Sequence, residues 1–244
     1  MKAIKKPGAV RKNISIVLVE PMSSGNVGSV ARAMKNTGFS NLRLVNPCDY
    51  GNNEAFSMAC KADDVLKNAE VFKDLKTCVQ DAGLVVGATR RKGKLRYPVA
   101  TLPEAVPHIM RLAKKNRVAI LFGREDKGLK NSEIALCDLL LEIPTSEACG
   151  SLNISHAVLM VCHAVFTSGE DIKKAIETAP RQEVSAMYGH LENMLVRLGY
   201  ADAGREFLKE SILRGFKRLF GRTGLMQKEI NMLRGIFAQI EKRT

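Results

Sequence analysis

Three segments that carry glycine or asparagine, each joined to a short apolar run, constrain the fold of this chain most strongly. They are GNVGSVAR (Gly25–Arg32), FGREDKGL (Phe122–Leu129) and IPTSEACGSLNIS (Ile143–Ser155). The apolar runs, ISIVLVE, VAILFG and LLLEIP, have the length and composition of strands. Loops at the carboxyl ends of strands form the ligand site in open α/β sheets. The pattern therefore predicts a site assembled from three loops, as in an enzyme.

Strand and helix signals alternate through residue 168, and the apolar runs are almost continuous in Val, Ile and Leu. Such runs indicate strands covered on both faces, which predicts an α/β domain with a mainly parallel sheet over residues 1–168. A hinge is predicted at Thr167–Glu170. Residues 169–244 then carry only helical patterns and form a small all-helical extension. The predicted helices of the whole chain are Val27–Asn36, Glu54–Ala69, Leu102–Lys115, Ser132–Leu136, Leu152–Phe166, Glu183–Leu198, Ala201–Phe220 and Leu225–Arg243.

The net charge of +13 is concentrated in three basic segments. Residues 1–12 hold five Lys or Arg, Arg90–Arg96 holds five in seven residues, and Arg205–Thr244 holds ten against four Glu. Separate basic clusters suit a long polyanion because each neutralised phosphate releases counterions. A nucleic acid partner is therefore favoured over the alternative that the charge serves solubility alone.

Other features argue against membranes, metals and disulfides. No apolar run approaches the ~20 residues of a membrane span, and the basic N-terminus lacks the apolar stretch of a signal peptide. The six cysteines are scattered without a C-x-x-C pair, as expected of thiols in a reducing compartment. We predict a cytoplasmic protein without a metal site.

Two common nucleotide motifs are tested against the sequence and rejected, the first on its glycine spacing and the second on the position of its lysine. A dinucleotide fingerprint needs G-x-G-x-x-G after the first strand, and Gly25-Asn-Val-Gly28 supplies only G-x-x-G. A P-loop needs Lys and then Ser or Thr after its second glycine, but Leu129 and Lys130 follow Gly128. The sequence therefore argues strongly against a P-loop NTPase.

The same three segments resemble the motifs of the SPOUT superfamily of S-adenosylmethionine-dependent RNA methyltransferases, in its ribose 2′-O branch. The patterns N-x-G-x-x-A-R, F-G-x-E-x-x-G-L and I-P…S-L-N-x-S-x-A occur in family order over residues 14–166. The matching residues are Asn26, Gly28, Ala31, Arg32; Phe122, Gly123, Glu125, Gly128, Leu129; and Ile143, Pro144, Ser151, Leu152, Asn153, Ser155, Ala157.

This resemblance implies properties that periodicity does not show. SPOUT members carry a C-terminal trefoil knot that holds the cofactor, although knots are almost absent from proteins in general. Members are homodimers with the cofactor near the subunit interface. The basic helical tail resembles that of TrmH/TrmJ-like tRNA methyltransferases that act in the anticodon loop.

The resemblance also assigns the cofactor contacts. Glycine-bearing loops let backbone N–H and C=O groups reach the adenine and ribose of S-adenosylmethionine, because no Cβ intervenes. Ordinary turn chemistry stays open as an explanation for each glycine. The residues carried over are Ala88, Thr89, Arg90, Gly123, Ile143, Gly150, Ser151 and Leu152.

Arg32 is the principal catalytic candidate, because a guanidinium stabilises a developing alkoxide and grips a phosphate bidentately. Its alternative is a solvated helix charge. Asn26, Ser151 and Asn153 complete the predicted catalytic set, with helix capping open as the alternative for both asparagines and for Ser155. Two neighbours of the motifs have structural interpretations. Glu125 is expected either to order its own loop or to be a surface carboxylate, and His156 to be a packed helix residue.

The predicted RNA-binding residues are basic and belong to two segments. Arg214, Lys217 and Arg218 follow helical i, i+3, i+4 spacing and share one face. Contacts of this kind position an RNA by its phosphates, whereas a solvated basic face is the alternative. The apolar set Leu208, Ile212, Leu219 and Phe220 is expected to pack on the catalytic domain or the other subunit. The full RNA-binding set is Arg91, Lys92, Lys94, Arg214, Lys217, Arg218 and Arg222.

The resemblance, supported by the basic segments, implies a tRNA (cytidine/uridine) ribose 2′-O-methyltransferase that uses S-adenosylmethionine, requires no metal and acts in the anticodon loop. Its expected partners are tRNA and a second copy of the chain. Two alternatives stay open: methylation of ribosomal RNA, and a non-catalytic RNA-binding protein with a vestigial cofactor pocket.

Overall fold

The computed structural model describes residues 8–91, 99–146, 150–168, 175–201, 206–221 and 223–242. Within them, seven strands form one sheet in the order β3-β2-β1-β6-β4-β7-β5, and every strand pairing is parallel. The predicted mainly parallel sheet is therefore confirmed. The strands are β1 Ile14–Val19, β2 Asn41–Val45, β3 Glu70–Phe72, β4 Leu84–Ala88, β5 Ala100–Thr101, β6 Val118–Phe122 and β7 Leu139–Glu142.

The sheet has a hydrophobic core on each face, which explains the continuous apolar runs. Every residue of β1 and β6 is buried. Successive side chains of a strand point to opposite faces, so Ile16 and Leu18 join the larger core while Val17 and Val19 join the smaller one.

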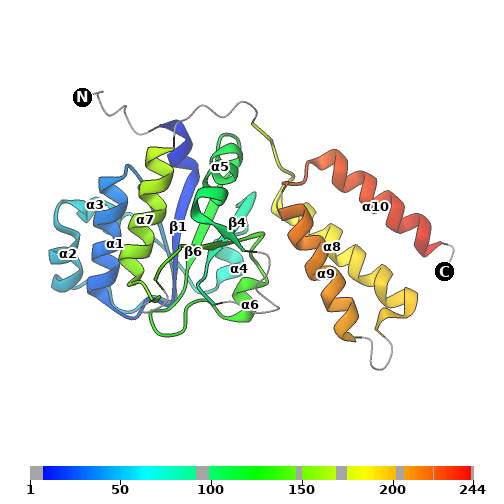
Figure 1. The fold of residues 1–244 in the computed structure, drawn as a ribbon, viewed down its shortest axis with the longest axis horizontal. Coiled ribbons are helices and arrows are strands. Elements are labelled where there is room, and N and C mark those ends of the chain that lie inside the picture. Colours follow the sequence, from blue (N-terminus) through cyan, green and yellow to red (C-terminus); the bar gives the residue numbers. More distant parts are fainter. Residues whose placement is uncertain are drawn as a thin grey trace.

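Helices cover both faces. The larger core includes residues of α1 (Ser24–Asn36), α2 (Asn53–Ala59), α3 (Asp63–Lys67), α5 (Leu102–Ala113) and α7 (Ile154–Thr167). The smaller core includes residues of α4 (Leu75–Cys78) and α6 (Asn131–Ile134). A 3-10 helix over Ala9–Asn13 precedes β1. In Figure 1, α1 and α7 lie side by side in front of the sheet, and the two helices are in contact.

Two sequence predictions about this domain are wrong. Glu54–Ala69 is not one helix, because Cys60 has a φ of 55° and a 3-10 turn over Cys60–Ala62 separates α2 from α3. Helical spacing of apolar residues continues across this break, so periodicity alone did not detect it. The segment Gly25–Arg32 is not a loop either, since α1 already begins at Ser24. The short elements β3, α4 and β5 were not predicted.

The three C-terminal helices form a group beside the α/β domain (Figure 1). They are α8 (Arg181–Leu195), which continues into a π-helical turn over Val196–Tyr200, α9 (Glu206–Gly221) and α10 (Gln227–Glu241). Their own core contains Met187, Leu191, Ile230 and Phe237. The predicted hinge Thr167–Glu170 lies partly outside the described residues.

The extension also contacts the α/β domain through polar groups. Arg181 of α8 forms an ion pair with Asp138 and donates to the Leu136 carbonyl at 2.6 Å. The His108 ring Nε2 of α5 lies 3.2 Å from the Gly221 carbonyl at the end of α9. These contacts place α8 beside the residues that precede β7, and the end of α9 beside α5.

The apolar residues of α9 divide into two groups. Ile212 and Phe220 pack against the core of the extension itself, and Phe220 also lines a small cavity together with Gly83 and Leu84 of the α/β domain. Leu208 and Leu219 are exposed in the single chain, and their contact with another subunit stays a prediction. None of the helices in the described ranges is long and apolar enough to cross a membrane.

Candidate functional site

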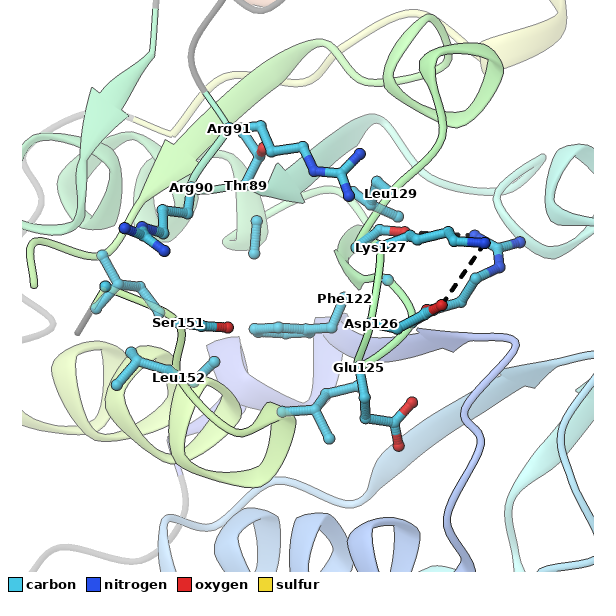
Figure 2. Close-up of a pocket in the computed structure, with 18 of the residues that line it drawn as sticks. Thr89, Arg90, Arg91, Phe122, Glu125, Asp126, Lys127, Leu129, Ser151 and Leu152 are labelled. Atoms are coloured by element: carbon cyan, nitrogen blue, oxygen red, sulfur yellow. Dashed lines mark hydrogen bonds and ion pairs between the residues drawn. The ribbon is translucent and has the colours of Figure 1, made fainter.

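A cavity of about 280 Å³ lies at the carboxyl ends of β4, β6 and β7 (Figure 2). Its lining comes from the segments that follow these three strands and from the start of α7. The lining residues are Ala88, Thr89, Arg90, Arg91, Phe122, Gly123, Arg124, Glu125, Asp126, Lys127, Gly128, Leu129, Leu141, Ile143, Thr145, Gly150, Ser151, Leu152, Ile154 and Ala157.

All eight residues predicted to contact the cofactor line this one cavity. Ala88, Thr89 and Arg90 lie at and after the end of β4, Gly123 follows β6, and the other four follow β7. Because β4 lies between β6 and β7 in the sheet, the ends of the three strands are neighbours. Figure 2 shows Arg90, Ser151 and Leu152 on one side of the cavity, with Leu129 and Lys127 on the other.

Two glycines shape the segment after β6. A Cβ on Gly123 would lie 2.1 Å from the Gly128 carbonyl carbon, so any side chain there would collide with backbone. Gly128 has a φ of 59°, which favours glycine, and its N–H donates to the Arg124 carbonyl at 2.8 Å. Turn chemistry therefore accounts for both glycines and at the same time brings their backbone to the cavity.

The segment after β7 lies directly against Arg90. A Cβ on Gly150 would lie 2.1 Å from the guanidinium carbon of Arg90, so that group rests on the Gly150 backbone. The Thr145 hydroxyl donates to the Gly150 carbonyl at 3.1 Å. These contacts hold the β4 and β7 segments together at the edge of the cavity.

A chain of side-chain hydrogen bonds joins the three motif segments. Asn153 Nδ2 donates to Asn26 Oδ1 at 3.0 Å, and Asn26 Nδ2 donates to Glu125 Oε1 at 3.0 Å. Glu125 Oε2 also accepts from the Met22 N–H at 3.0 Å. Glu125 is therefore neither an ordinary surface carboxylate nor a brace within its own loop, because it bonds to α1 and to the residues before it.

The capping alternatives divide between the two asparagines. Asn26 is not an N-cap, because Ser23 caps α1 and accepts from the Asn26 N–H at 3.2 Å. Asn153 is the N-cap of α7 and accepts from the Ser155 N–H at 2.8 Å. The expectation for His156 is wrong, since this residue is exposed.

Arg32 does not line the cavity. It is exposed on α1, six positions beyond Asn26, and among the residues that the structure describes its side chain forms no hydrogen bond or ion pair. Within one chain the structure thus brings Asn26 and Asn153 together but leaves Arg32 at the surface of the helix. Its catalytic role stays a prediction.

The basic residues of α9 line a second hollow, of about 530 Å³, between α9 and the α/β domain. Arg214, Lys217 and Arg218 face residues of α6 and β7 across it. Burial lowers the pKa of Lys217 and of Arg218, and Lys217 Nζ lies 5.6 Å from the centre of the Tyr188 ring. The three side chains share one face as predicted, but they are half-buried and do not form a fully solvated face.

Of the four other predicted RNA-binding residues, the structure describes one. Arg91 lines the first cavity. Lys92, Lys94 and Arg222 lie outside the described residues. Throughout the described ranges, no group of three or more His, Cys, Asp or Glu residues is placed to hold a metal ion.

Sequence reasoning missed one charged cluster beside the first cavity. Arg124 occupies the unspecified position of the F-G-x-E pattern, and its buried guanidinium contacts both Glu20 and Glu133. The signal available in the sequence was weak: an arginine in a cavity loop, with glutamates directly after β1 and within α6. Nothing in the spacing of these residues along the chain indicates that they meet.

Comparison with protein families matches both parts of the chain. Residues 13–163 match the SpoU rRNA Methylase family. Residues 182–244 match the C-terminal domain of the tRNA methyltransferase TrmJ.

Individual proteins match over nearly the whole length. A relative from Citrobacter koseri, named tRNA (cytidine/uridine-2'-O-)-methyltransferase TrmJ, is 35% identical over 240 residues, which covers 95% of this chain and 98% of the relative. The crystal structure of TrmJ from Z. mobilis ZM4 superposes with a TM-score of 0.75 at 35% identity and covers 93% of this chain and 98% of that one. A probable methylase family protein from Haemophilus influenzae gives a TM-score of 0.63 at 31% identity, with 96% and 97% coverage.

Proposed function

The chain belongs to the SpoU methylase family, and we propose that it methylates the ribose 2′-hydroxyl of a cytidine or uridine in the anticodon loop of tRNA, with S-adenosylmethionine as methyl donor. The observation that carries this proposal is the match of both parts of the chain, in order, to relatives named tRNA (cytidine/uridine-2'-O-)-methyltransferase and to the C-terminal domain of TrmJ. A match confined to the α/β domain would support an RNA methyltransferase without favouring tRNA over ribosomal RNA.

The chemistry of the first cavity suits S-adenosylmethionine. Leu129, Ile143 and Leu152 offer apolar surface for an adenine ring. The segments at Gly123 and Gly150 bring backbone to the wall, where peptide groups can bond the adenine edge and the ribose hydroxyls. We assign the cofactor contacts to Ala88, Thr89, Arg90, Gly123, Ile143, Gly150, Ser151 and Leu152.

When bound, S-adenosylmethionine supplies an electrophilic methyl group on its sulfonium. Transfer would join the ribose 2′-oxygen to the methyl carbon, return the carbon–sulfur electron pair to sulfur as S-adenosylhomocysteine, and pass the hydroxyl proton to water. The hydrogen bonds from Asn153 through Asn26 to Glu125 fix the orientation of the Asn153 amide at the start of α7, beside Ser151. We assign Ser151, Asn153 and Asn26 to positioning the ribose at this point.

Arg32 is assigned to the RNA side of the reaction. Its guanidinium would grip a phosphate next to the reacting ribose and stabilise the negative charge that develops on the 2′-oxygen. Since Arg32 is exposed on α1 and away from the cavity lining of its own chain, we place the working site at a contact between two copies. The exposed apolar side chains Leu159 and Met160 on α7, which packs on α1, suit such a homodimer.

The extension is assigned to capturing tRNA in the cytoplasm through phosphate contacts from α9. Arg214, Lys217 and Arg218 supply three positive charges on one face. Such contacts hold an RNA in register without reading its sequence.

The test is transfer of the labelled methyl group of S-adenosylmethionine to bulk tRNA, followed by digestion to nucleosides. We expect 2′-O-methylcytidine and 2′-O-methyluridine from the anticodon loop. Label on a base would move the protein to another branch of methyltransferases, and label on ribosomal RNA alone would favour the ribosomal alternative. Cofactor binding without any transfer would favour a non-catalytic RNA-binding protein.

A further inference from the structure

The guanidinium of Arg124 is fully bonded and buried beside the cofactor cavity. Nε and Nη2 donate to the two carboxylate oxygens of Glu20, each at 2.6 Å. Nη1 and Nη2 donate to Glu133 at 3.1 and 2.9 Å, and Nη1 also lies 3.4 Å from the Gly128 carbonyl. A guanidinium has five N–H donors in one plane. Each of them has an acceptor here, so the orientation of the side chain is fixed.

The two carboxylates belong to different elements. Glu20 directly follows β1 and has a left-handed backbone with φ of 48°, an uncommon conformation for a residue with a side chain. Glu133 lies in α6, and its Oε2 also accepts the Lys130 N–H at 2.6 Å. Arg124 therefore connects the end of β1, the segment after β6 and the start of α6.

Adjacent residues bond the same stretch of chain from two directions. Arg124 donates to the Glu20 side chain, while Glu125 accepts from the Met22 N–H. Glu125 continues the connection to Asn26 and through it to Asn153. The segment Gly123–Gly128 is thus held on one side by the Arg124 ion pairs and on the other by the Glu125 hydrogen bonds.

We propose that Arg124 is a positioning residue for methyl transfer: through Glu20 and Glu133 it holds Gly123–Gly128 in the conformation that the cofactor requires. This inference rests on the proposed function, since it takes S-adenosylmethionine as the occupant of the cavity. Arg124 closes the segment at its base, where its carbonyl accepts from the Gly128 N–H. A change of its orientation moves the backbone that forms the cavity wall.

Lysine cannot replace Arg124 in this geometry. Its single ammonium nitrogen cannot bond both oxygens of Glu20 and both oxygens of Glu133 in one plane. We expect Arg124→Lys to weaken binding of S-adenosylmethionine by roughly 10- to 100-fold, because a displaced segment loses one or two hydrogen bonds to the cofactor and each is worth up to about tenfold in affinity. Binding of tRNA in the absence of the cofactor should not change, because the RNA contacts are assigned to α9.

Arg43 provides a matched control at a distance from the cavity. Its side chain has the same 7% exposure as that of Arg124. It bonds both oxygens of Asp81 at 2.7 Å and lies 3.1 Å from Glu70. Arg43→Lys therefore breaks a similar buried ion cluster and should lower thermal stability to a similar extent, without an effect on cofactor affinity.

The experiment compares wild type, Arg124→Lys, Glu20→Gln and Arg43→Lys by calorimetric titration with S-adenosylmethionine, at a temperature where circular dichroism shows all four folded. The proposal requires weaker binding by Arg124→Lys and Glu20→Gln but not by Arg43→Lys. It also requires a non-additive double variant. The fold loss of cofactor affinity in Arg124→Lys, Glu20→Gln should be smaller than the product of the fold losses in the two single variants, because the residues act as one unit.

Other outcomes distinguish failure of the inference about Arg124 from failure of the proposed function. If wild type binds S-adenosylmethionine and methylates tRNA, but both single variants bind as wild type does, Arg124 serves stability alone and the inference is wrong. Equal loss of affinity in Arg43→Lys would also overturn it. If wild type itself fails to bind the cofactor, the proposed function fails instead. Glu20 is 39% exposed at its side chain, so Glu20→Gln provides a milder variant if Arg124→Lys does not fold.

Discussion

The cofactor cavity and the basic face of α9 are built in different ways. The cavity is lined by the segments that follow three strands, with glycines at positions 123 and 150, where a Cβ would collide. The face on α9 consists of long side chains, Arg214, Lys217 and Arg218, on a helix that packs on its own small core. Backbone geometry constrains residue identity strongly, whereas a basic surface requires only charge at suitable spacing. Mutations in the cavity should therefore impair cofactor binding, and mutations in the α9 face should impair tRNA binding, each without the other.

The largest effect on turnover should come from Arg32→Ala, which tests whether catalysis can be lost while the cofactor cavity still binds. We expect turnover to fall by about 100-fold or more, because a partner of transition-state charge is lost. Cofactor affinity should stay nearly unchanged, since Arg32 does not line the cavity of its own chain. Single-turnover kinetics and calorimetry measure the two quantities.

Lys35→Ala is the matched control, because Lys35 is exposed on the same helix and pairs with Asp64 at 2.5 Å. It should leave turnover unchanged. A collapse of cofactor affinity in Arg32→Ala, with high residual turnover at saturating cofactor, would contradict the assignment of Arg32 to the RNA side.

Asn153→Asp should have the next largest effect on turnover. This variant separates the two roles of the Asn153 side chain, which caps α7 and donates to Asn26. Aspartate can still cap α7 by accepting from the Ser155 N–H, so stability should be retained. A carboxylate cannot donate to Asn26 Oδ1, so the connection to Glu125 is lost. We expect turnover to fall on the order of 10- to 100-fold, with an unchanged melting temperature. Full activity in this variant would show that capping is the only role of Asn153.

On the α9 side, the double variant Lys217→Gln, Arg218→Gln should weaken tRNA binding with little effect on the cofactor. Removing two phosphate contacts should raise the tRNA KM and reduce the slope of log affinity against log salt by roughly 1 to 2. Glutamine avoids placing a new carboxylate in the half-buried hollow. Lys228→Gln, on the exposed surface of α10, is the control. Unchanged tRNA affinity in the double variant would show that this face serves assembly only.

The sequence predicted the parts of the molecule that local patterns encode. The apolar runs identified β1, β6 and β7, and the eight residues predicted to contact the cofactor line a single cavity. Their contacts to the cofactor stay a prediction. The predicted trefoil knot and homodimer stay predictions. The break at Cys60 escaped detection because the helical periodicity of apolar residues continues across it.

Contacts between residues far apart in the chain were not predictable in the same way. Glu20 and Glu133 meet at Arg124 only because β1 and β6 are neighbours in the sheet and α6 begins shortly after β6. The half-burial of Lys217 likewise depends on how α9 packs beside β7. Both are consequences of tertiary packing, which the spacing of charged residues does not report.

The smallest functional effect is expected from Asp81→Asn, at the end of the sheet opposite the cavity. Hydrogen bonds from Arg43 hold the pKa of Asp81 below its ordinary value of 3.8. The folded state therefore binds this proton less readily than the unfolded chain, so the stabilisation is present at neutral pH. This stabilisation is lost as the pH falls below 3.8 and through the lowered folded pKa.

Urea unfolding, measured from pH 7 to pH 3, should give the variant a free energy of unfolding about 1 to 3 kcal/mol lower than that of wild type at pH 7. This difference should narrow toward pH 3. Cofactor affinity and tRNA affinity should both match wild type. A loss of cofactor binding in this variant would show that ion clusters far from the cavity also set its geometry, and the contrast between the cavity and the rest of the molecule would have to be redrawn.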